Sequence, residues 1–270
     1  MLEESRRFMK RNRKRSLKRQ HELIGRAFKK QASEWAQQRV SPDLHWVARQ
    51  LALRRSLSVL DVAAGTGLLS QAVAPKVKRV VALDVTLEMI TEGYKKVQQR
   101  GLRNIVFILG TAEALPFPAG TFDLVMTRFS FHHLRRPETV LREMKRVCRP
   151  GGKVVVVDLL ASADEKLRAR YNLLERLRDS SHTEALCQRQ MESMATKLGL
   201  KTISFPSRRV KMDFEKWLDF AHAGPAARDR IRAALQQELQ GAKPTGFQPL
   251  VEKGRLVFRH TWGVLVAGKL

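Results

Sequence analysis

The 270-residue sequence is 43% hydrophobic, which is enough for a sizeable core, and its length favours one domain with insertions. Lysine and arginine number 51 against 26 acidic residues, a net charge of +25. No apolar run approaches the roughly 18 residues that span a membrane, and no hydrophobic signal segment follows the charged first residues. The two cysteines, Cys148 and Cys187, have neither metal-ligand nor disulfide spacing, so we expect no metal site and a cytoplasmic location.

A large share of the positive charge lies at the start of the chain. Residues 1–30 hold 12 basic and 3 acidic side chains, and residues 1–16 have the composition of a flexible arm. Such a segment favours weak contact with polyanions or acidic membranes. The alternative is a solvated basic surface, which the spread of the remaining charge favours. We therefore predict no specific nucleic-acid partner.

Two helices are predicted before residue 54. A stripe of apolar side chains at helical spacing predicts a helix over residues 17–38. The stripe consists of Leu17, Ile24, Phe28 and Trp35. A Ser-Pro-Asp sequence at residues 41–43 then begins a second, shorter helix.

Residues 57–67 combine a short apolar strand, a turn of small residues and the start of a helix. The turn is Ala-Ala-Gly-Thr-Gly at residues 63–67, and a helical period begins at Leu68. Small residues let a ligand approach the backbone, and a helix N-terminus offers free N–H groups. A plain tight turn explains the same residues, so the turn alone does not decide between the two interpretations.

Strands and helices alternate from there to about residue 160. Further apolar strands are predicted at residues 79–84, 105–109, 122–126 and 154–160, with helices between them. Continuous apolar strands that alternate with helices indicate a parallel sheet covered on both faces. Right-handed crossovers then place the carboxyl ends of the strands at one edge, where ligands bind.

The pattern changes after residue 163. Amphipathic helices are predicted around residues 167–177 and 184–198, followed by a strand at 201–212. Residues 213–250 contain two short helices and a stretch rich in glycine and proline, which we interpret as an insertion. Residues 262–267 form the predicted last strand.

Particular residues stand where the predicted strands end. Asp61 ends the first strand, and Asp84 ends the second, 19 residues after Gly65, where a carboxylate is placed to accept two ribose hydroxyls. The later motifs are Gly-Thr-Ala-Glu-Ala-Leu-Pro-Phe at 110–117, Phe-Asp-Leu-Val at 122–125, His-His-Leu at 132–134 and Arg-Pro-Gly-Gly at 149–152.

In this order the motifs resemble those of the class I S-adenosylmethionine-dependent methyltransferases, closest to the branch with the ubiquinone/menaquinone C-methyltransferases. The resemblance covers roughly residues 25–200. It implies an α/β fold with a Rossmann-like doubly wound sheet, mostly parallel with the last strand antiparallel. It divides the chain into the basic arm 1–16 and a methyltransferase domain 17–270. Within this domain lie N-terminal helices (17–54), a cofactor-binding core (57–163) and a substrate-capping insertion (213–250).

The resemblance also implies which residues bind S-adenosyl-L-methionine. The 63–67 turn approaches the methionine portion, Asp61 holds this turn and faces the amino end, and Asp84 takes the ribose hydroxyls. Arg128 offers its backbone carbonyl to the ammonium group. The complete set is Phe28, Asp61, Ala63, Ala64, Gly65, Gly67, Asp84, Val85, Met89, Thr111, Ala112, Glu113 and Arg128.

Two positions depart from the family pattern. Ala63 replaces the first glycine of the turn but remains small. Thr111 replaces the usual aspartate, so the contact with the adenine amino group loses an acidic partner. We expect this loss to cost roughly 1 kcal/mol of affinity, the value of a neutral hydrogen bond.

Methyl transfer from a sulfonium needs alignment and often a base. The candidates are His132, His133, Asp158 and His182. For each there is a structural alternative: the paired histidines pack against or cap the next helix, Asp158 holds a loop, and His182 starts a helix. Trp217, Phe220 and His222 of the insertion either line the acceptor site or pack the insertion onto the domain.

The predicted function is methyl transfer to an O, C or N nucleophile of a small molecule. The alternative is an RNA methyltransferase or a nucleic-acid-associated protein, which the charge suggests. The fourth strand is followed by Thr-Arg-Phe-Ser-Phe at 127–131 rather than the Asp/Asn-Pro-Pro-Tyr/Phe of adenine N-methylases. We expect a monomer or a homodimer.

Overall fold

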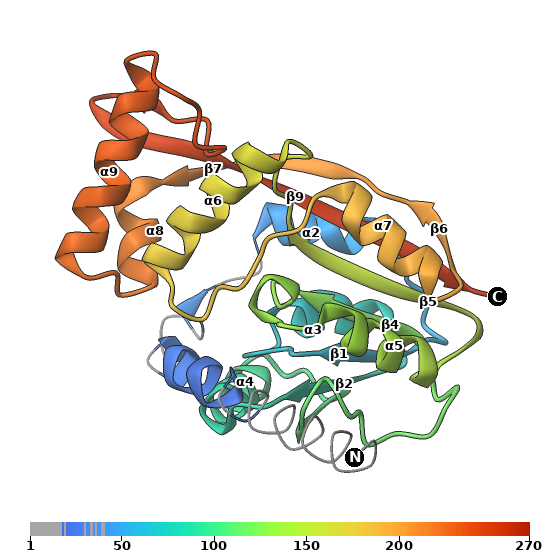
Figure 1. The fold of residues 1–270 in the computed structure, drawn as a ribbon. Coiled ribbons are helices and arrows are strands. Elements are labelled where there is room, and N and C mark those ends of the chain that lie inside the picture. The colour runs from blue at the N-terminus through green and yellow to red at the C-terminus, as the bar shows by residue number, and fades with distance from the viewer. Residues whose placement is uncertain (1–17, 19, 30, 33–34, 36, 39–40) are drawn as a thin grey trace, which may run out of the picture.

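The computed structural model describes all residues except 1–17, 19, 30, 33–34, 36 and 39–40, so the predicted arm lies outside the described residues. Residues 20–29 are helical. The remaining elements, shown in Figure 1, are α2 (Pro42–Arg49), β1 (Ser58–Val62), α3 (Leu68–Val73), η1 (Ala74–Lys76), β2 (Arg79–Asp84), α4 (Leu87–Gln99), β3 (Ile105–Leu109), β4 (Phe122–Arg128), η2 (Phe131–His133), α5 (Pro137–Val147), β5 (Cys148–Leu159), α6 (Glu165–Arg178), α7 (Gln188–Lys197), β6 (Leu200–Ser204), β7 (Ser207–Asp213), α8 (Phe214–Phe220), α9 (Pro225–Leu239), β8 (Leu250–Glu252) and β9 (Arg255–Lys269).

One sheet organises the fold. Its order is β3-β2-β1-β4-β5-β9-β6, and β7 and β8 also pair with β9. Strands β1 to β5 pair in parallel, whereas β9 runs antiparallel to β5. This confirms the predicted α/β fold, mostly parallel with an antiparallel last strand. The strand order reverses between β1 and β4, and such a switch point is where open α/β sheets bind ligands.

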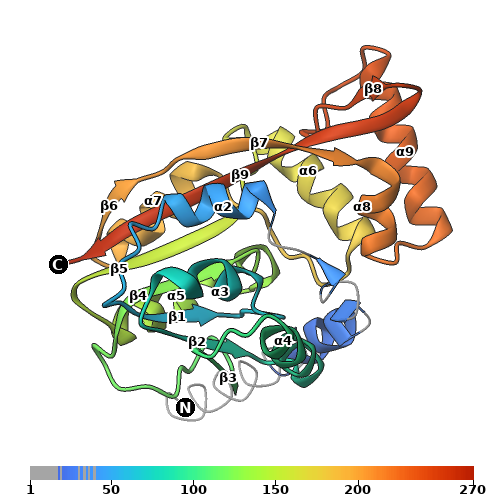
Figure 2. The same cartoon turned by 180° about the vertical axis from the view of Figure 1, so that it is seen from behind.

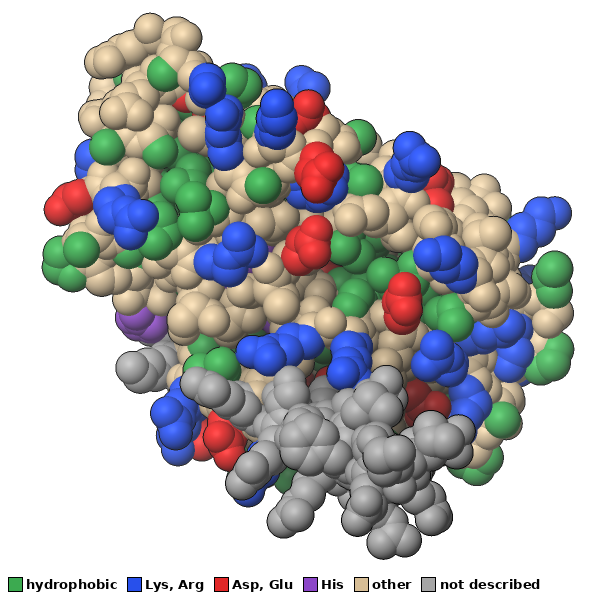
Figure 3. All heavy atoms as spheres, in the orientation of Figure 1, with side chains coloured by type: hydrophobic (Ala, Val, Ile, Leu, Met, Phe, Trp, Pro, Cys, Tyr) green, Lys and Arg blue, Asp and Glu red, His purple; other side chains and the backbone are tan. Residues whose placement is uncertain are grey.

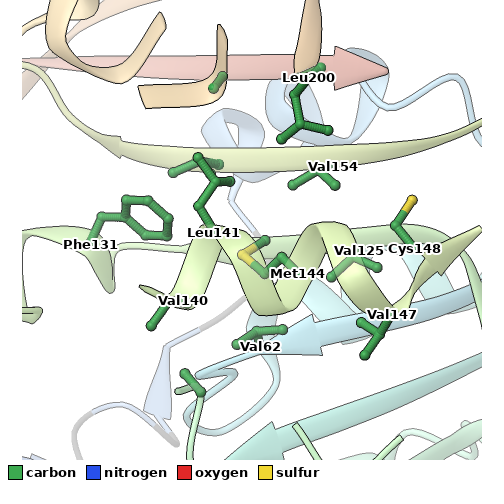
Figure 4. Packing of buried hydrophobic residues seen from close by; sticks show 14 of the residues in the cluster. Val62, Val125, Phe131, Val140, Leu141, Met144, Val147, Cys148, Val154 and Leu200 are labelled. Carbon is green, nitrogen blue, oxygen red and sulfur yellow. The ribbon is translucent and has the colours of Figure 1, made fainter. Parts of the chain in front are cut away.

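Helices cover both faces of the sheet because its central strands are apolar on both sides. One core joins β-strand residues such as Leu60 and Val125 to α5 and α7, and Figure 4 shows Leu141 and Met144 of α5 packed over these strands. The other core joins the opposite face to α2, α3 and α4. Figures 1 and 2 show these two helical layers from opposite sides.

The insertion forms a third core at one end of the sheet. Phe214, Trp217 and Leu218 of α8 and Ile231 of α9 pack with Tyr171 of α6. Buried Phe247 and Phe258 complete this core. Figure 1 shows α8 and α9 beyond the parallel part of the sheet. This aromatic cluster anchors the insertion and includes Phe258, near the first residue of β9.

The structure differs from the sequence predictions in several local details. Residues 201–212 form two strands, β6 and β7, interrupted at Phe205 and Pro206, because proline has no N–H for the ladder. The helix predicted from residue 184 begins at Gln188. Strand β5 begins at Cys148, so the Pro-Gly-Gly sequence at 150–152 lies within the strand.

Gly93 lets α4 approach the 63–67 turn closely. A Cβ atom there would lie 2.8 Å from the Phe107 ring and 2.8 Å from the Thr66 carbonyl oxygen. We expect Gly93→Ala to lower the free energy of unfolding, since overpacking costs about 1–3 kcal/mol and the helix propensity of alanine returns about 1 kcal/mol. Urea unfolding of the parent and of Gly93→Ala measures this difference in the free energy of unfolding. Gly25→Ala is the control, because nothing lies within 4 Å of its Cβ; an equal effect of both changes would contradict the prediction.

Candidate functional site

A first cavity, of about 820 Å³ of empty volume, opens beyond the carboxyl ends of β1, β2 and β4. Many of its lining residues belong to the predicted cofactor set: Phe28, Ala63, Ala64, Gly65, Asp84, Val85, Met89, Ala112, Glu113 and Arg128. Three members of the set, Asp61, Gly67 and Thr111, do not line it. The fold therefore brings most of the predicted residues to one cavity.

Asp84 joins the turn to the end of β2. Its Oδ2 accepts a hydrogen bond from the Gly65 N–H at 2.7 Å, and its Oδ1 accepts from the Thr86 N–H at 2.8 Å. Burial raises the pKa of Asp84, while these N–H groups act in the opposite direction. The carboxylate is consequently fixed in orientation at the wall of the first cavity.

The 63–67 turn has a backbone conformation that favours glycine. Ala63 has φ 52° and Gly65 has φ 57°, both in the left-handed region. For alanine this conformation costs roughly 1–2 kcal/mol. The replacement at position 63 is therefore a matter of backbone strain as well as of size, which the sequence comparison with the family pattern does not show.

Asp61 lies beneath the first cavity rather than at its wall. Its Oδ2 accepts hydrogen bonds from the Ser70 hydroxyl at 2.7 Å and the Ser70 N–H at 3.1 Å, which tie β1 to α3. Its buried Oδ1 has no hydrogen-bond partner among the residues that the structure describes. Burial raises the pKa of Asp61 to about 7.

The N-terminal helix closes the first cavity from outside. His21 Nε2 lies 3.1 Å from Glu113 Oε2, and the Gln20 side-chain amide donates to the His133 carbonyl. The Phe28 ring meets the His133 ring edge-on at 5.1 Å. The described part of the helix thus covers the first cavity.

A second cavity, of about 1450 Å³ of empty volume, adjoins the first. The two cavities share Phe28, Trp35, Leu68, Arg128, Phe129 and His133. Aromatic side chains from distant segments line the second cavity, among them Trp217, Phe220 and Trp262. Of the insertion residues considered from the sequence, Trp217 and Phe220 line this cavity and His222 does not.

Of the four catalytic candidates, His132 and His133 line the second cavity, whereas Asp158 and His182 do not. The His132 Nδ1 is hydrogen-bonded to Asp158 Oδ1. Burial lowers the pKa of His132, but the Asp158 carboxylate outweighs burial and the pKa is raised overall. Burial likewise opposes ionisation of Asp158, and the charge of His132 lowers its pKa overall. The two side chains form a buried ion pair.

This ion pair predicts a pH dependence of stability. The raised pKa of His132 gives stability that is complete below its unfolded pKa of about 6.5 and is lost as the pH rises through its folded value. The lowered pKa of Asp158 gives stability that is present above about pH 4 and is lost in acid. The free energies of unfolding of the parent and of His132→Gln, measured in urea, should therefore differ most near about pH 5–6 and less in alkali. A difference independent of pH would refute the assignment.

His133 belongs to a chain of hydrogen bonds that sequence reasoning missed. Ser181 Oγ lies 2.6 Å from Asp179 Oδ1 and 3.0 Å from His133 Nδ1. An ionised carboxylate only accepts, so the one hydroxyl proton of Ser181 is donated to Asp179. His133 Nδ1–H is then the donor to Ser181, which leaves Nε2 with a free lone pair. Burial, together with the charge of His132, lowers the pKa of His133 to about 4, so the ring is neutral.

His182 is set back from both cavities. Its Nε2 lies 2.7 Å from Asn172 Oδ1, and its ring packs 5.4 Å from that of His132. Burial lowers its pKa to about 3. The histidines do not form a metal centre, since no group of three or more metal-ligating side chains is present in the described part of the chain. Of the residues around His182, Arg178 and Asp179 line the second cavity, and Ser181 contacts His133.

The comparisons with known proteins agree with this arrangement. Residues 60–156 match the methyltransferase domain family. The uncharacterised methyltransferase YcgJ of Bacillus subtilis is 29% identical over 79% of this chain and 91% of its own. The structure of a candidate methyltransferase from Bacillus halodurans superposes with a TM-score of 0.76 and 28% identity, over 84% of this chain and 98% of that one.

Enzymes of quinone biosynthesis are similar over a shorter region. The demethylmenaquinone methyltransferase of Anoxybacillus flavithermus is 37% identical over 114 residues, which are 41% of this chain and 48% of that protein. The chain thus matches about half the length of this relative.

The Rossmann-like sheet, the glycine turn and the carboxylate at the end of β2 are typical of a nucleotide-binding fold, and the comparisons support an enzyme of the methyltransferase class. The chain contains a methyltransferase domain, and it is similar to methyltransferases that include a demethylmenaquinone methyltransferase. Its cofactor is S-adenosylmethionine, and a methyl acceptor is its substrate. Among the described residues no helix is long and apolar enough to cross a membrane.

Proposed function

We propose that the enzyme transfers the methyl group from S-adenosylmethionine in the first cavity to a small molecule in the second. The observation that carries this proposal is the boundary shared by the two cavities, which includes Arg128, Phe129 and His133. A displacement at carbon needs donor and acceptor in line and in contact. A shared boundary allows this, and the second cavity has room for an organic acceptor.

The residues of the first cavity fit the cofactor chemically. The oriented Asp84 carboxylate suits ribose hydroxyls, and apolar Val85 and Met89 suit the adenine ring. The buried, unpartnered Oδ1 of Asp61 suits the positively charged amino end, reached through water. When bound, the cofactor supplies a methyl group on a good leaving group. What the chain adds is orientation, exclusion of water by the N-terminal helix, and a proton acceptor.

His133 Nε2 is the proton acceptor in this proposal. Its ring lies at the boundary of the two cavities, and Nε2 is assigned the role because Nδ1 is hydrogen-bonded to Ser181. His132 is less suited to the role because its Nδ1 is hydrogen-bonded to Asp158, which raises the pKa of the ring and favours its protonated form. A base with a pKa of about 4 is weak. This low pKa favours a methyl acceptor whose O–H, N–H or C–H group is acidic.

The RNA alternative has less support. Figure 3 shows lysine and arginine side chains spread over the visible face, with acidic side chains among them, rather than one continuous basic track. The acceptor cavity is lined by aromatic residues of the insertion, and a relative is named for a quinone precursor. The contact of residues 1–30 with polyanions or membranes, and the monomer or homodimer, stay predictions.

Transfer of a labelled methyl group tests the proposal. The protein is incubated with methyl-labelled S-adenosylmethionine in two separate reactions. One contains the low-molecular-weight extract of the cells that produce the protein, and the other contains total RNA from those cells. We expect label in an organic small molecule and none in RNA. Label confined to RNA would overturn the small-molecule proposal in favour of the alternative.

A further inference from the structure

Arg128 is the last residue of β4 and lies at the boundary of both cavities. Its guanidinium carbon is 4.7 Å from the centre of the Phe129 ring and 5.6 Å from that of the Trp35 ring. Phe129 has φ 53°, a strained backbone for an aromatic residue, and its ring also contacts Trp262. Two aromatic rings and a strained turn thus hold the guanidinium at this position.

The guanidinium has five N–H donors, yet no hydrogen bond or ion pair reaches it from the described residues. Arg178, in the same cavity, shows the usual alternative: it pairs with Glu175 and donates to the Trp217 carbonyl. Burial lowers the pKa of Arg128 to about 10, so the side chain remains charged at neutral pH. A half-buried cation without a hydrogen-bonded partner among the described residues is costly, which indicates a partner that binds from outside the chain.

The carboxylates nearby are already engaged. Asp61 and Asp158 act on Arg128 through space only, since Asp61 accepts from Ser70 and Asp158 is paired with His132. Elsewhere around the second cavity, Asp43 pairs with Arg208 at 3.1 Å and Asp213 accepts from the Lys216 N–H at 3.0 Å. Asp179, which also lines this cavity, accepts from the Ser181 hydroxyl, so none of the described carboxylates is hydrogen-bonded or ion-paired to Arg128.

The first cavity differs from the second in the charged side chains at its wall. It is lined by the carboxylates of Asp84 and Glu113, which suit the hydroxyls and positive groups of the cofactor. An anion is better matched on the acceptor side, where the exposed Lys216 also lies and no described residue pairs with its ammonium.

We propose that the Arg128 guanidinium binds an anionic group of the methyl acceptor, so that the substrate is an aromatic or similarly apolar molecule with a carboxylate or another acidic oxygen. This inference rests on the proposed function of the second cavity. Arg128 would bind the anion by paired N–H donors, the geometry that arginine offers to a carboxylate, while the aromatic wall takes the apolar body. The same charge lowers the pKa of an acidic nucleophile beside His133, which compensates for the weakness of that base.

Benzoate and its neutral analogue benzamide test the proposal, with binding measured by NMR in the presence of saturating S-adenosylhomocysteine. We expect the parent to bind benzoate at least about 10-fold more tightly than benzamide, which corresponds to about 1.4 kcal/mol. Arg128→Gln should abolish this preference, and Arg128→Lys should keep part of it. Lys211→Gln is the matched control, because Lys211 lines the same cavity but is paired with Glu252, and it should keep the preference.

Calorimetry with the cofactor product separates this inference from the proposed function. Arg128→Gln should bind S-adenosylhomocysteine as the parent does. If it loses S-adenosylhomocysteine affinity but keeps that for 5′-methylthioadenosine, which lacks the amino acid portion, the partner is the cofactor carboxylate and the inference is overturned. An unchanged benzoate preference in a folded Arg128→Gln protein also overturns it. Absence of S-adenosylhomocysteine binding by the parent would instead refute the cofactor site.

Discussion

Replacing His133 by glutamine is expected to lower kcat by about 100- to 10,000-fold, the range that a positioned general base contributes. The effect arises because Nε2 is the free lone pair at the boundary of the two cavities, while Nδ1 is occupied by Ser181. Affinity for S-adenosylhomocysteine should change little, since the cofactor-binding carboxylate Asp84 is untouched. Steady-state kinetics with the acceptor found by label transfer measure the loss.

The hydrogen-bond chain behind His133 gives a sharper version of the same prediction. In Asp179→Asn the amide can donate to Ser181, which reverses the hydrogen-bond direction and leaves His133 Nδ1 as the acceptor. Nε2 then carries the proton, so kcat should fall towards that of His133→Gln with an unchanged fold. Asp179 and Ser181 are positioning residues in this account.

The pH profile distinguishes this role from a merely structural one. Because burial and the charge of His132 lower the pKa of His133 to about 4, the base is available above that pH and is lost as the pH falls through it. The acid limb of the parent should therefore lie near pH 4 rather than near about 6.5, the ordinary value for histidine. A full rate in His133→Gln, or an acid limb at the ordinary histidine value, would contradict the assignment.

Replacing Asp84 by alanine is expected to weaken S-adenosylhomocysteine binding by about 10-fold or more, which is about 1.4 kcal/mol. Two effects add: the ribose hydroxyls lose their acceptor, and the Gly65 and Thr86 N–H groups lose theirs, so the turn is no longer held. Isothermal titration calorimetry measures the change.

Thr111→Ala is the matched control for Asp84. It lies where the family usually has an acid for adenine, but its side chain does not line the first cavity. We expect its effect on S-adenosylhomocysteine affinity to be small. An equal loss in both variants, or no loss in Asp84→Ala, would show that the carboxylate at the end of β2 does not hold the ribose.

The sequence predicted the sheet because its strands are strongly marked. Apolar runs such as Val154–Val157 are buried on both faces, and such runs alternate with helices in only a few architectures. The same regularity predicted that residues following β1, β2 and β4 would meet at one edge. Most of the cofactor set does line one cavity, although the role of each residue stays a prediction.

The acceptor side was not predictable in the same way. Its wall combines Trp35, Phe129, Trp217 and Trp262, which come from four distant segments. No short motif connects such residues. The pairing of Ser181 with His133 spans 48 positions of the chain and depends on how the loop after α6 folds back. That no described residue forms a hydrogen bond or ion pair with the Arg128 guanidinium is visible only when its neighbours are in place.

Local backbone strain was also hidden. Phe129 with φ 53° and Ala63 with φ 52° lie beside the two cavities, and neither residue type signals a left-handed conformation. The burial of Asp61 beneath the turn, rather than at its surface, follows from its hydrogen bonds to Ser70, which the strand–turn–helix pattern alone does not specify.

A crystal structure of the protein with S-adenosylhomocysteine tests the central claim most directly. We expect the ribose hydroxyls at Asp84 and the sulfur at the boundary formed by Arg128, Phe129 and His133, directed into the second cavity. A sulfur directed away from the second cavity, or a ligand bound outside the first, would contradict the account.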